Sequence, residues 1–216
     1  NALKSFNFLK SFSKKNLVYG VNTGFGPMAD FKINKEDQIK LQYNLIRSHS
    51  SGMGAVLPTQ VVKVIMIIRL HTFLQGKSGV SQSLINTLSN YIDNGIYPDI
   101  YEHGGVGASG DLVQLAHLTL GIIGEGKGVN NKGEKDYISK LIKESNLQPH
   151  KLELRDGLAM INGTACMTSF STFNIINSRI LIKWSVKISA MMLEIFGSYD
   201  DYMSKELNQV KIHKGQ

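Results

Sequence analysis

The sequence predicts a mainly α-helical fold. Apolar residues recur at helical spacing in several segments, whereas the strict alternation typical of half-buried strands is rare. From Asn162 to Gln216 the chain contains no proline, so we expect one or two long buried helices there, interrupted only near Gly197. With 42% hydrophobic and 19% charged residues, the composition is ordinary for a globular protein of 216 residues.

The other helices are predicted in order along the chain from apolar residues three and four positions apart and from capping residues at their ends. The predictions are an amphipathic opening helix with Leu3, Phe6 and Leu9 on one face; residues 35–50 with Ile39, Tyr43 and Ile46 on one face; residues 59–75 with Val62, Ile65, Met66 and Phe73; residues 82–94 between Ser81 as N-cap and Gly95; and Asp111 to about Ile123. The glycine- and lysine-rich stretch Gly124–Lys135 predicts an exposed loop or hairpin.

Composition and spacing disfavour several classes of protein. The net charge of +7 comes from scattered lysines without a basic run interleaved with aromatics, which favours a solvated basic face over a nucleic-acid partner. The single cysteine, Cys166, excludes a multi-cysteine zinc site, and the six histidines never pair at metal-binding spacing, so no metal is expected. The longest apolar run, Val61–Leu70, is broken by Lys63 and Arg69, so no membrane span is expected.

Two glycine-rich stretches, Tyr19–Pro27 and His103–Gly110, are predicted to be non-helical. In the second, Ala108-Ser109-Gly110 can undergo a specific reaction if the chain turns tightly. The amide nitrogen of Gly110 can attack the carbonyl carbon of Ala108 to close a five-membered ring, and glycine offers the least hindered nitrogen. Loss of water from the ring and from the Ser109 hydroxyl gives a methylidene-imidazolone, an electrophile that no standard side chain provides.

The position of this tripeptide is favourable for such chemistry. Asp111 is expected to start a helix, so the ring would lie at a helix N-terminus, where the dipole favours developing negative charge. The simpler interpretation is that Ala-Ser-Gly is a common tripeptide in a loop capped by an aspartate. The tripeptide alone therefore does not establish the reaction.

Five stretches closely resemble the histidine/phenylalanine/tyrosine ammonia-lyase family. They are Tyr19-Gly-Val-Asn-Thr-Gly-Phe-Gly26, Asn44-Leu-Ile-Arg-Ser-His-Ser-Ser-Gly52, Gly105-Val-Gly-Ala-Ser-Gly-Asp-Leu112, Gly121-Ile-Ile-Gly-Glu-Gly126 and Gly157-Leu-Ala-Met-Ile-Asn-Gly-Thr164. They occur in the family's order and at its spacing, over nearly the whole chain. The resemblance implies that Ala108-Ser109-Gly110 forms a 4-methylidene-imidazol-5-one (MIO) group, which makes the amine of an aromatic amino acid a leaving group.

The resemblance also implies roles for individual residues. Tyr19 would be the base that takes the β-proton, on a glycine-rich loop that acts as a mobile lid. Asn162 would hydrogen-bond the ring or the substrate amine. Taken singly, Tyr19 could be a loop anchor and Asn162 a helix-start residue. The remaining implied residues are Ser48, His49 and Gly26 for substrate binding, with Asp111 and Leu112 supporting cyclisation.

The substrate is left open between histidine and tyrosine or phenylalanine. The pair Ser48-His49 resembles the pair found in family members that act on histidine. The His49 imidazole would suit such a substrate, because it can exchange hydrogen bonds with the substrate imidazole. The alternative is that His49 only caps a helix C-terminus. Asp111-Leu-Val-Gln-Leu115 also resembles tyrosine-acting relatives, so histidine is favoured only slightly.

The resemblance predicts the architecture around this site. Residues 1–160 would form a loop-rich N-terminal domain that carries the ring, and residues 161–216 the beginning of a central helical bundle. The family's chain is more than twice as long, so this chain would be an inactive piece of a cytoplasmic homotetramer. Two rivals share the fold: an aminomutase, distinguished by its products, and a non-enzymatic helical module, whose intact mass would lack the loss of two waters.

Overall fold

The computed structural model describes residues 1–211 and 213 of the chain. Helices dominate it, and its strands are only two to four residues long. The prediction of a mainly α-helical fold is therefore confirmed. The chain divides into two compact units, Asn1–Ser171 and Thr172–Gln216.

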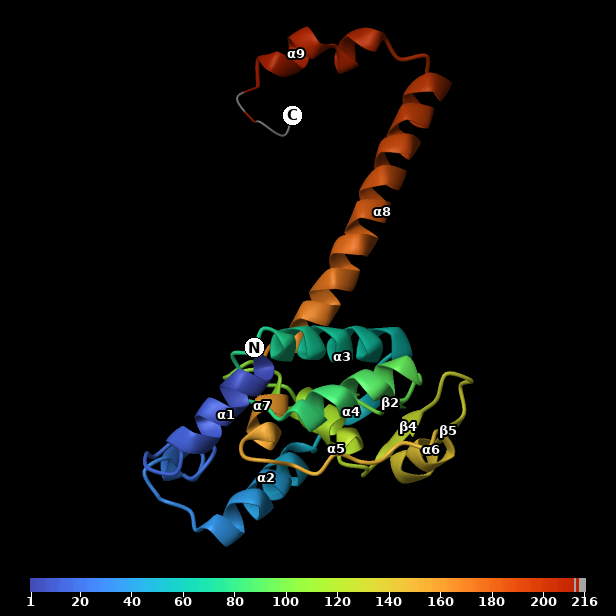
Figure 1. Cartoon of the computed structure of the whole chain (residues 1–216). Helices are drawn as coiled ribbons and strands as arrows, with labels where there is room; N and C mark the ends of the chain where they lie inside the picture. Colours follow the sequence, from blue (N-terminus) through green and yellow to red (C-terminus); the bar gives the residue numbers. More distant parts are fainter. Residues whose placement is uncertain (212, 214–216) are drawn as a thin grey trace. The chain divides into compact units, whose positions relative to one another are not determined.

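Helix α1 (Ala2–Phe12) opens the first unit where an amphipathic helix is predicted (Figure 1). Phe6 and Leu9 are buried, as expected. Leu3 is 55% exposed, so the predicted face packs only over its later part. The helix is held to the unit by its second and third turns.

Helix α2 (Lys35–His49) also forms where it is predicted, but its buried face matches the predicted one only in part. Ile46 is fully buried, whereas Ile39 is 37% exposed, so the predicted face is wrong at Ile39. The buried residues are Gln42, Leu45 and Ile46. The helix turns this way because the Gln42 amide bonds to backbone groups of two other segments.

Helices α3 (Thr59–Leu74) and α4 (Gln82–Asp93) confirm their predictions. The four predicted core residues of α3, Val62, Ile65, Met66 and Phe73, are all buried. At the start of α4 the Ser81 hydroxyl accepts a hydrogen bond from the Leu84 N–H at 3.1 Å, which is the expected N-cap. The two helices pack against each other.

Helix α5 (Leu112–Ile122) lies at the centre of the first unit (Figure 1). Several of its side chains are completely buried: Leu115, Ala116, Leu118 and Ile122. A mostly apolar helix that is buried on nearly all sides belongs in the interior of a fold. It packs against α2 and against α7 (Asp156–Ile161), so the elements that flank the predicted ring and Asn162 share one core.

Short strands form two small antiparallel sheets among the described residues. The strands are β1 (Met53–Val56) paired with β3 (Tyr101–His103), and β2 (Tyr97–Pro98), β4 (Lys127–Val129) and β5 (Lys135–Tyr137) in the order β2-β4-β5. The β4–β5 hairpin confirms the loop or hairpin expected at Gly124–Lys135. It leads into helix α6 (Ile138–Glu144).

A buried polar cluster fixes the start of α7. Asp156 is completely buried, and its Oδ2 atom accepts a hydrogen bond from the Ser81 hydroxyl at 2.7 Å. The same oxygen lies 2.9 Å from His150 Nε2, which must be the donor because a carboxylate only accepts. The Ser81 N–H donates to Oδ1 at 3.0 Å. These bonds tie the beginning of α4 to the helix that leads into Asn162.

Helix α8 (Ala165–Ile195) begins in the first unit and continues in the second. The predicted interruption near Gly197 is confirmed, since α8 ends at Ile195 and Gly197 has a φ of 60°. The expectation of a second long helix beyond it is wrong for the described residues, which form only two short helices there. The predicted burial is wrong for the described residues, because Leu181 and Trp184 are 68% and 58% exposed. The buried residues of α8 are Ala165, Cys166 and Ser169. A helix buries a face only where another element packs on it, and the described chain covers little of this one.

The second unit also contains a short 3₁₀ helix, η2 (Asp200–Met203), and helix α9 (Lys205–Gln209). The Ser204 hydroxyl caps α9 by accepting a hydrogen bond from the Leu207 N–H. Within residues 1–211 and 213, every helix is too short or too polar to cross a membrane.

Candidate active site

The predicted ring-forming tripeptide lies in the loop that joins β3 to α5. Ala108 and Ser109 are exposed and Gly110 is half-buried. Ser109 has a φ of 76° and Gly110 a φ of 108°. A positive φ is uncommon for a residue other than glycine, so the chain turns sharply at Ser109. This is the kind of bent backbone that the predicted cyclisation requires.

Gly110 packs directly against the segment that follows α7. A Cβ atom at Gly110 would lie 2.8 Å from the Gly163 nitrogen, 2.9 Å from its oxygen and 3.4 Å from Asn162 Oδ1. Only glycine fits at such a close approach. The structure therefore brings Gly110, the end of the predicted ring, next to Asn162, although the two residues lie far apart in the sequence.

Asp111 joins the ring segment to the first turn of α8. Its N–H donates to the Gly163 carbonyl at 2.7 Å, and its Oδ2 atom accepts from the Met167 N–H at 2.9 Å. Asp111 precedes α5 but makes no side-chain cap there; its carboxylate serves the N-terminus of α8, where a negative charge is stabilised. Leu112, half-buried, is the first residue of α5. Together these contacts hold the turn at Ser109 in place.

Tyr19 lies on the other glycine-rich loop, which is non-helical up to Phe25. The prediction is wrong at Gly26 and Pro27, because a short 3₁₀ helix, η1 (Gly26–Met28), begins there. The Tyr19 hydroxyl oxygen accepts a hydrogen bond from the Gly26 N–H at 3.1 Å, and the Tyr19 ring contacts Phe25 edge-on with centroids 6.1 Å apart. The buried Asn22 amide folds the loop by donating to the Ser13 and Asn16 carbonyls. Two of the predicted residues, Tyr19 and Gly26, are thus in contact.

Gln42, which the sequence did not single out, connects this loop to α7. Its side chain is 1% exposed; Nε2 donates to the Gly20 carbonyl at 2.9 Å and Oε1 accepts from the Leu158 N–H at 2.9 Å. One side chain therefore links the residue after Tyr19 to the helix that ends at Asn162. The two partners lie 22 and 116 residues away, so no local pattern could have identified them.

Replacing Gln42 with leucine is expected to loosen both segments. The substitution leaves a buried N–H and a buried carbonyl without partners, at about 1–3 kcal/mol each. Amide hydrogen exchange of the full-length protein should speed up at residues 18–26 and 156–162. Gln38→Leu is the matched control, because the Gln38 side-chain amide donates to the Ile33 carbonyl, a partner nearby in the sequence. Equal protection in both variants would contradict the role given to Gln42.

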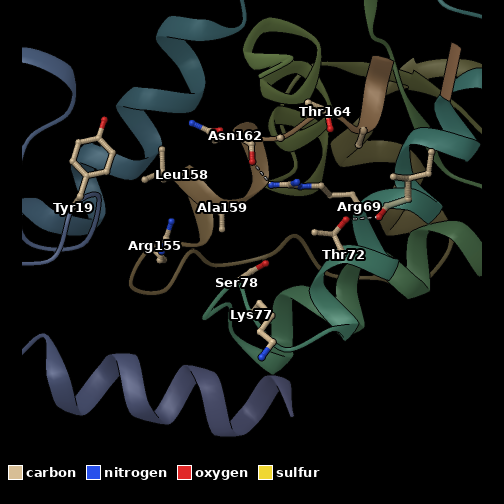
Figure 2. Close-up of a pocket in the computed structure, with 13 residues that line it drawn as sticks. Tyr19, Arg69, Thr72, Lys77, Ser78, Arg155, Leu158, Ala159, Asn162 and Thr164 are labelled. Carbon is tan, nitrogen blue, oxygen red and sulfur yellow. Dashed lines mark hydrogen bonds between the residues drawn. The ribbon is translucent and has the colours of Figure 1, made fainter. Parts of the chain in front are cut away.

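A cavity of about 520 Å³ lies beside Tyr19 and Asn162. It is lined by Tyr19, Ile68, Arg69, Thr72, Lys77, Ser78, Arg155, Leu158, Ala159, Asn162, Gly163, Thr164 and Ala165. Figure 2 shows the Arg69 side chain reaching from α3 toward Asn162, with Tyr19 on the far side of α7. The predicted base and the predicted ring partner therefore line one cavity, whereas Ser109 lies outside its lining.

Arg69 is the second residue that the sequence analysis missed. It is only 5% exposed, and its Nη2 atom donates to the Asn162 carbonyl at 2.7 Å. Burial lowers its pKa to about 10, partly offset by the charge of Asp111, so it remains cationic near neutral pH. Arg69 continues the buried face of Val62, Ile65, Met66 and Phe73, and a charge on an apolar face is a signal that could have revealed it.

Ser48 and His49 lie at the C-terminal end of α2, outside the lining of this cavity. His49 Nδ1 is 2.9 Å from the Leu45 carbonyl, and the Ser48 hydroxyl donates to that same carbonyl at 3.1 Å. A carbonyl only accepts, so Nδ1 carries a hydrogen and Nε2 is left for another partner. His49 thus bonds to the helix end, as in the simpler interpretation, while its outer nitrogen stays available.

Metal ligands do not gather at this site. Among residues 1–211 and 213, no group of three or more His, Cys, Asp or Glu side chains is placed to hold a metal ion. The buried His150–Asp156 pair is occupied in fixing α7.

Comparison with known proteins places the whole chain in one family. The profile of the family described as aromatic amino acid lyase matches residues 1–216. A probable histidine ammonia-lyase of Thermoplasma volcanium is 39% identical over 209 residues, which are 97% of this chain and 42% of that protein. Histidine ammonia-lyase of Bacillus cytotoxicus is 38% identical over 93% of this chain and 39% of its own length. The chain thus spans about two fifths of these relatives.

Solved structures show the same similarity. Histidine ammonia-lyase from Trypanosoma cruzi aligns with a TM-score of 0.91 at 26% identity, over 99% of this chain and 42% of that one. Pantoea agglomerans phenylalanine aminomutase aligns with a TM-score of 0.92 at 25% identity, over 98% of this chain and 41% of that one.

Proposed function

The chain belongs to the aromatic amino acid lyase family, and we propose on this premise that the full-length protein eliminates ammonia from an aromatic amino acid. The observation that carries the proposal is the packing of the Ser109-Gly110 turn against Asn162-Gly163, close enough that only glycine fits. Relatives named histidine ammonia-lyase, at 37–39% identity, support the reaction class. Because they are more than twice as long, the activity belongs to the longer protein.

Ala108-Ser109-Gly110 is proposed to form the MIO group, and the residues present fit it. The positive φ values at Ser109 and Gly110 bend the backbone, and Asp111 anchors the turn to α8. When formed, the group supplies an electrophile that turns the substrate amine into a leaving group. Asn162 is proposed to hydrogen-bond the ring or the substrate amine, and the proximity of its Oδ1 atom to Gly110 supports this role. Asp111 and Leu112 act as supports.

Tyr19 is proposed to take the β-proton of the substrate. Its hydroxyl oxygen is held by the Gly26 N–H, and its loop is held by Gln42 to the helix that carries Asn162. A proton acceptor must be kept within reach of the proton that it takes. The contacts that hold the Tyr19 loop are therefore proposed to position the phenol for this step. The exposed loop tip is suited to cover the substrate and exclude water.

Histidine is the proposed substrate, slightly favoured over tyrosine and phenylalanine, with Ser48, His49 and Gly26 contacting it. The support is the free Nε2 of His49, which can exchange a hydrogen bond with an imidazole. The test is to incubate the full-length protein with L-histidine, L-tyrosine and L-phenylalanine and to follow the conjugated acid by ultraviolet absorbance. Product from histidine alone supports the assignment, and product from tyrosine or phenylalanine alone contradicts it.

His49→Leu is expected to shift the preference from histidine toward phenylalanine, measured as the ratio of kcat/KM values. Loss of a hydrogen bond that reads the substrate is expected to change this ratio by about 10- to 100-fold. His71→Leu is the matched control, since His71 is an exposed helical histidine outside the site. An unchanged ratio in His49→Leu would mean that His49 only caps the end of α2.

An aminomutase is the second candidate, because Pantoea agglomerans phenylalanine aminomutase shares the fold closely. Both reactions need the same electrophile, and they differ in whether ammonia is added back at the β-carbon. Chromatography of the products distinguishes a β-amino acid from the free conjugated acid.

We further propose that the full-length protein is a cytoplasmic homotetramer. Size-exclusion chromatography with light scattering can test the oligomeric state.

A further inference from the structure

We propose that His117, on the central helix α5, is a positioning residue for substrate recognition, because it fixes the chain segment that follows Ser48-His49. The inference rests on the proposed function, in which His49 contacts the substrate. His117 acts through His49 and does not itself touch the substrate. It lies on an element that the sequence analysis linked only to the ring.

The contact is a hydrogen bond between two segments that are distant in the sequence. The Gly52 N–H donates to His117 Nε2 at 2.9 Å, and the two residues lie 65 positions apart. Nε2 accepts only while it carries no hydrogen, so the imidazole is neutral with its hydrogen on Nδ1. His117 is 8% exposed, and burial lowers its pKa, which favours this neutral form. The Tyr101 ring packs edge-on against the imidazole, with centroids 4.9 Å apart, and holds its orientation.

This hydrogen bond lies where the end of α2 is joined to β1. Helix α2 ends at His49 and β1 begins at Met53, so only three residues connect them (52 − 49). A Cβ atom on Gly52 would lie 3.0 Å from His117 Nε2 and 3.1 Å from the His103 carbonyl oxygen. The backbone therefore passes tightly between α5 and β3. Movement of Gly52 would displace the end of α2 that carries His49.

The same point contacts the loop that leads to the ring-forming tripeptide. A Cβ atom on Gly104 would lie 3.3 Å from Gly52 Cα and 2.8 Å from Val113 Cγ1. Val113 and His117 are four residues apart on α5 (117 − 113), so they lie on one face of that helix. This face holds both the Gly52 segment and the start of the ring-bearing loop. His117 thereby sets where His49 lies relative to the ring.

The test measures ligand preference in the full-length protein and needs no turnover. Calorimetry gives the Kd values of 3-(imidazol-4-yl)propanoate and 3-phenylpropanoate, and amide hydrogen exchange is followed at residues 50–53. The variants are His117→Leu, which removes the acceptor, and His117→Gln, which supplies an amide oxygen as acceptor. His49→Leu and the double variant of His49→Leu with His117→Leu complete the set. His71→Leu is the matched control, because His71 is an exposed histidine on α3.

The wild type is expected to discriminate between the two acids. His117→Leu should change the ratio of their Kd values by about 10-fold, because a small displacement of a recognition group is costly. Exchange at Gly52 should speed up by about 10-fold as its partner is lost. His117→Gln should keep the ratio and the exchange rate near their wild-type values. Since His117 acts through His49, the double variant should show the same ratio as His49→Leu alone.

The inference is overturned if His117→Leu weakens both acids equally, which would make His117 a purely structural residue. Effects of the two leucine substitutions that simply add would also overturn it, as would a ratio lost equally in His117→Gln. If His117→Leu does not fold, Gly52→Ala, whose Cβ would press on the imidazole, is judged by the same ratio and exchange rate.

A wild type that binds neither acid, or does not discriminate between them, also overturns the inference, because His117 then has no recognition to position. A wild type that discriminates as expected but releases no ammonia from any amino acid would contradict the proposed function. The role of His117 would stand in that case.

Discussion

Replacing Ser109 with alanine in the full-length protein is expected to abolish the release of ammonia, lowering kcat by about 10³-fold or more, because no other group in the chain supplies an equivalent electrophile. The Ser109 hydroxyl is the group that must leave as water, and alanine has nothing to lose. The side chain is exposed on a loop, so the substitution removes little packing. Activity should therefore fall without a matching loss of stability.

Intact mass and ultraviolet spectra separate chemistry from folding in this experiment. The wild type should be lighter than its sequence by two water molecules, and Ser109→Ala should lack the dehydration that creates the methylidene group. Ser11→Ala is the matched control, since Ser11 is an exposed serine on α1 whose hydroxyl donates to the nearby Phe8 carbonyl. Full activity of Ser109→Ala, or a wild type of undiminished mass, would contradict ring formation.

Gly110→Ala is expected to disrupt the same turn more severely than Ser109→Ala, because Gly110 packs against the Gly163 backbone. The added Cβ would meet the Gly163 backbone at 2.8 and 2.9 Å, and backbone cannot move aside as a flexible side chain can. The left-handed φ of 108° is also unfavourable for alanine. The turn at Ser109 is thus shaped from outside, by the segment after α7, as well as by its own glycines.

The helices could be predicted from the sequence because their signals are local. The Ser81 cap and the periodic apolar face of α3 involve residues within a few positions of one another. The short strands carry too few residues for an alternating pattern and form only because distant segments pair, as Met53 does with His103. Their position was therefore not predictable from spacing.

The residues of the candidate site also differ in whether their signals in the sequence are local. The residues of the two glycine-rich loops could be identified because a backbone turn requires glycine and because their order resembles a family. Gln42 could not, since a buried polar side chain is recognised by its partners, and those of Gln42 lie far along the chain. Arg69 carries a local signal, a charge on an apolar helix face, but its bond to the Asn162 carbonyl is equally distant in sequence and was not predictable. The buried face predicted for α2 was wrong at Ile39 for this reason. Gln42 faces the core instead, and its hydrogen-bond partners lie far along the chain.

Replacing Tyr19 with phenylalanine is the second change with a large expected effect: kcat should fall by about 10²- to 10⁴-fold, the usual contribution of a positioned base. Phenylalanine keeps the ring that contacts Phe25 edge-on, so the loop should retain its shape. The hydrogen bond that is lost, from the exposed Gly26 N–H, can be replaced by water. Stability should therefore change by less than about 1 kcal/mol.

Measuring whether Tyr19→Phe changes kcat or KM distinguishes a catalytic base from a loop anchor. A base acts only on the proton transfer, so its loss lowers kcat while KM stays near its wild-type value. A loop anchor would act differently, because a disordered loop weakens substrate binding and raises KM. Tyr137→Phe is the matched control, since Tyr137 is an exposed tyrosine on β5, outside the cavity. A raised KM with nearly normal kcat would make Tyr19 an anchor and leave the base to be supplied by another residue of the full-length protein.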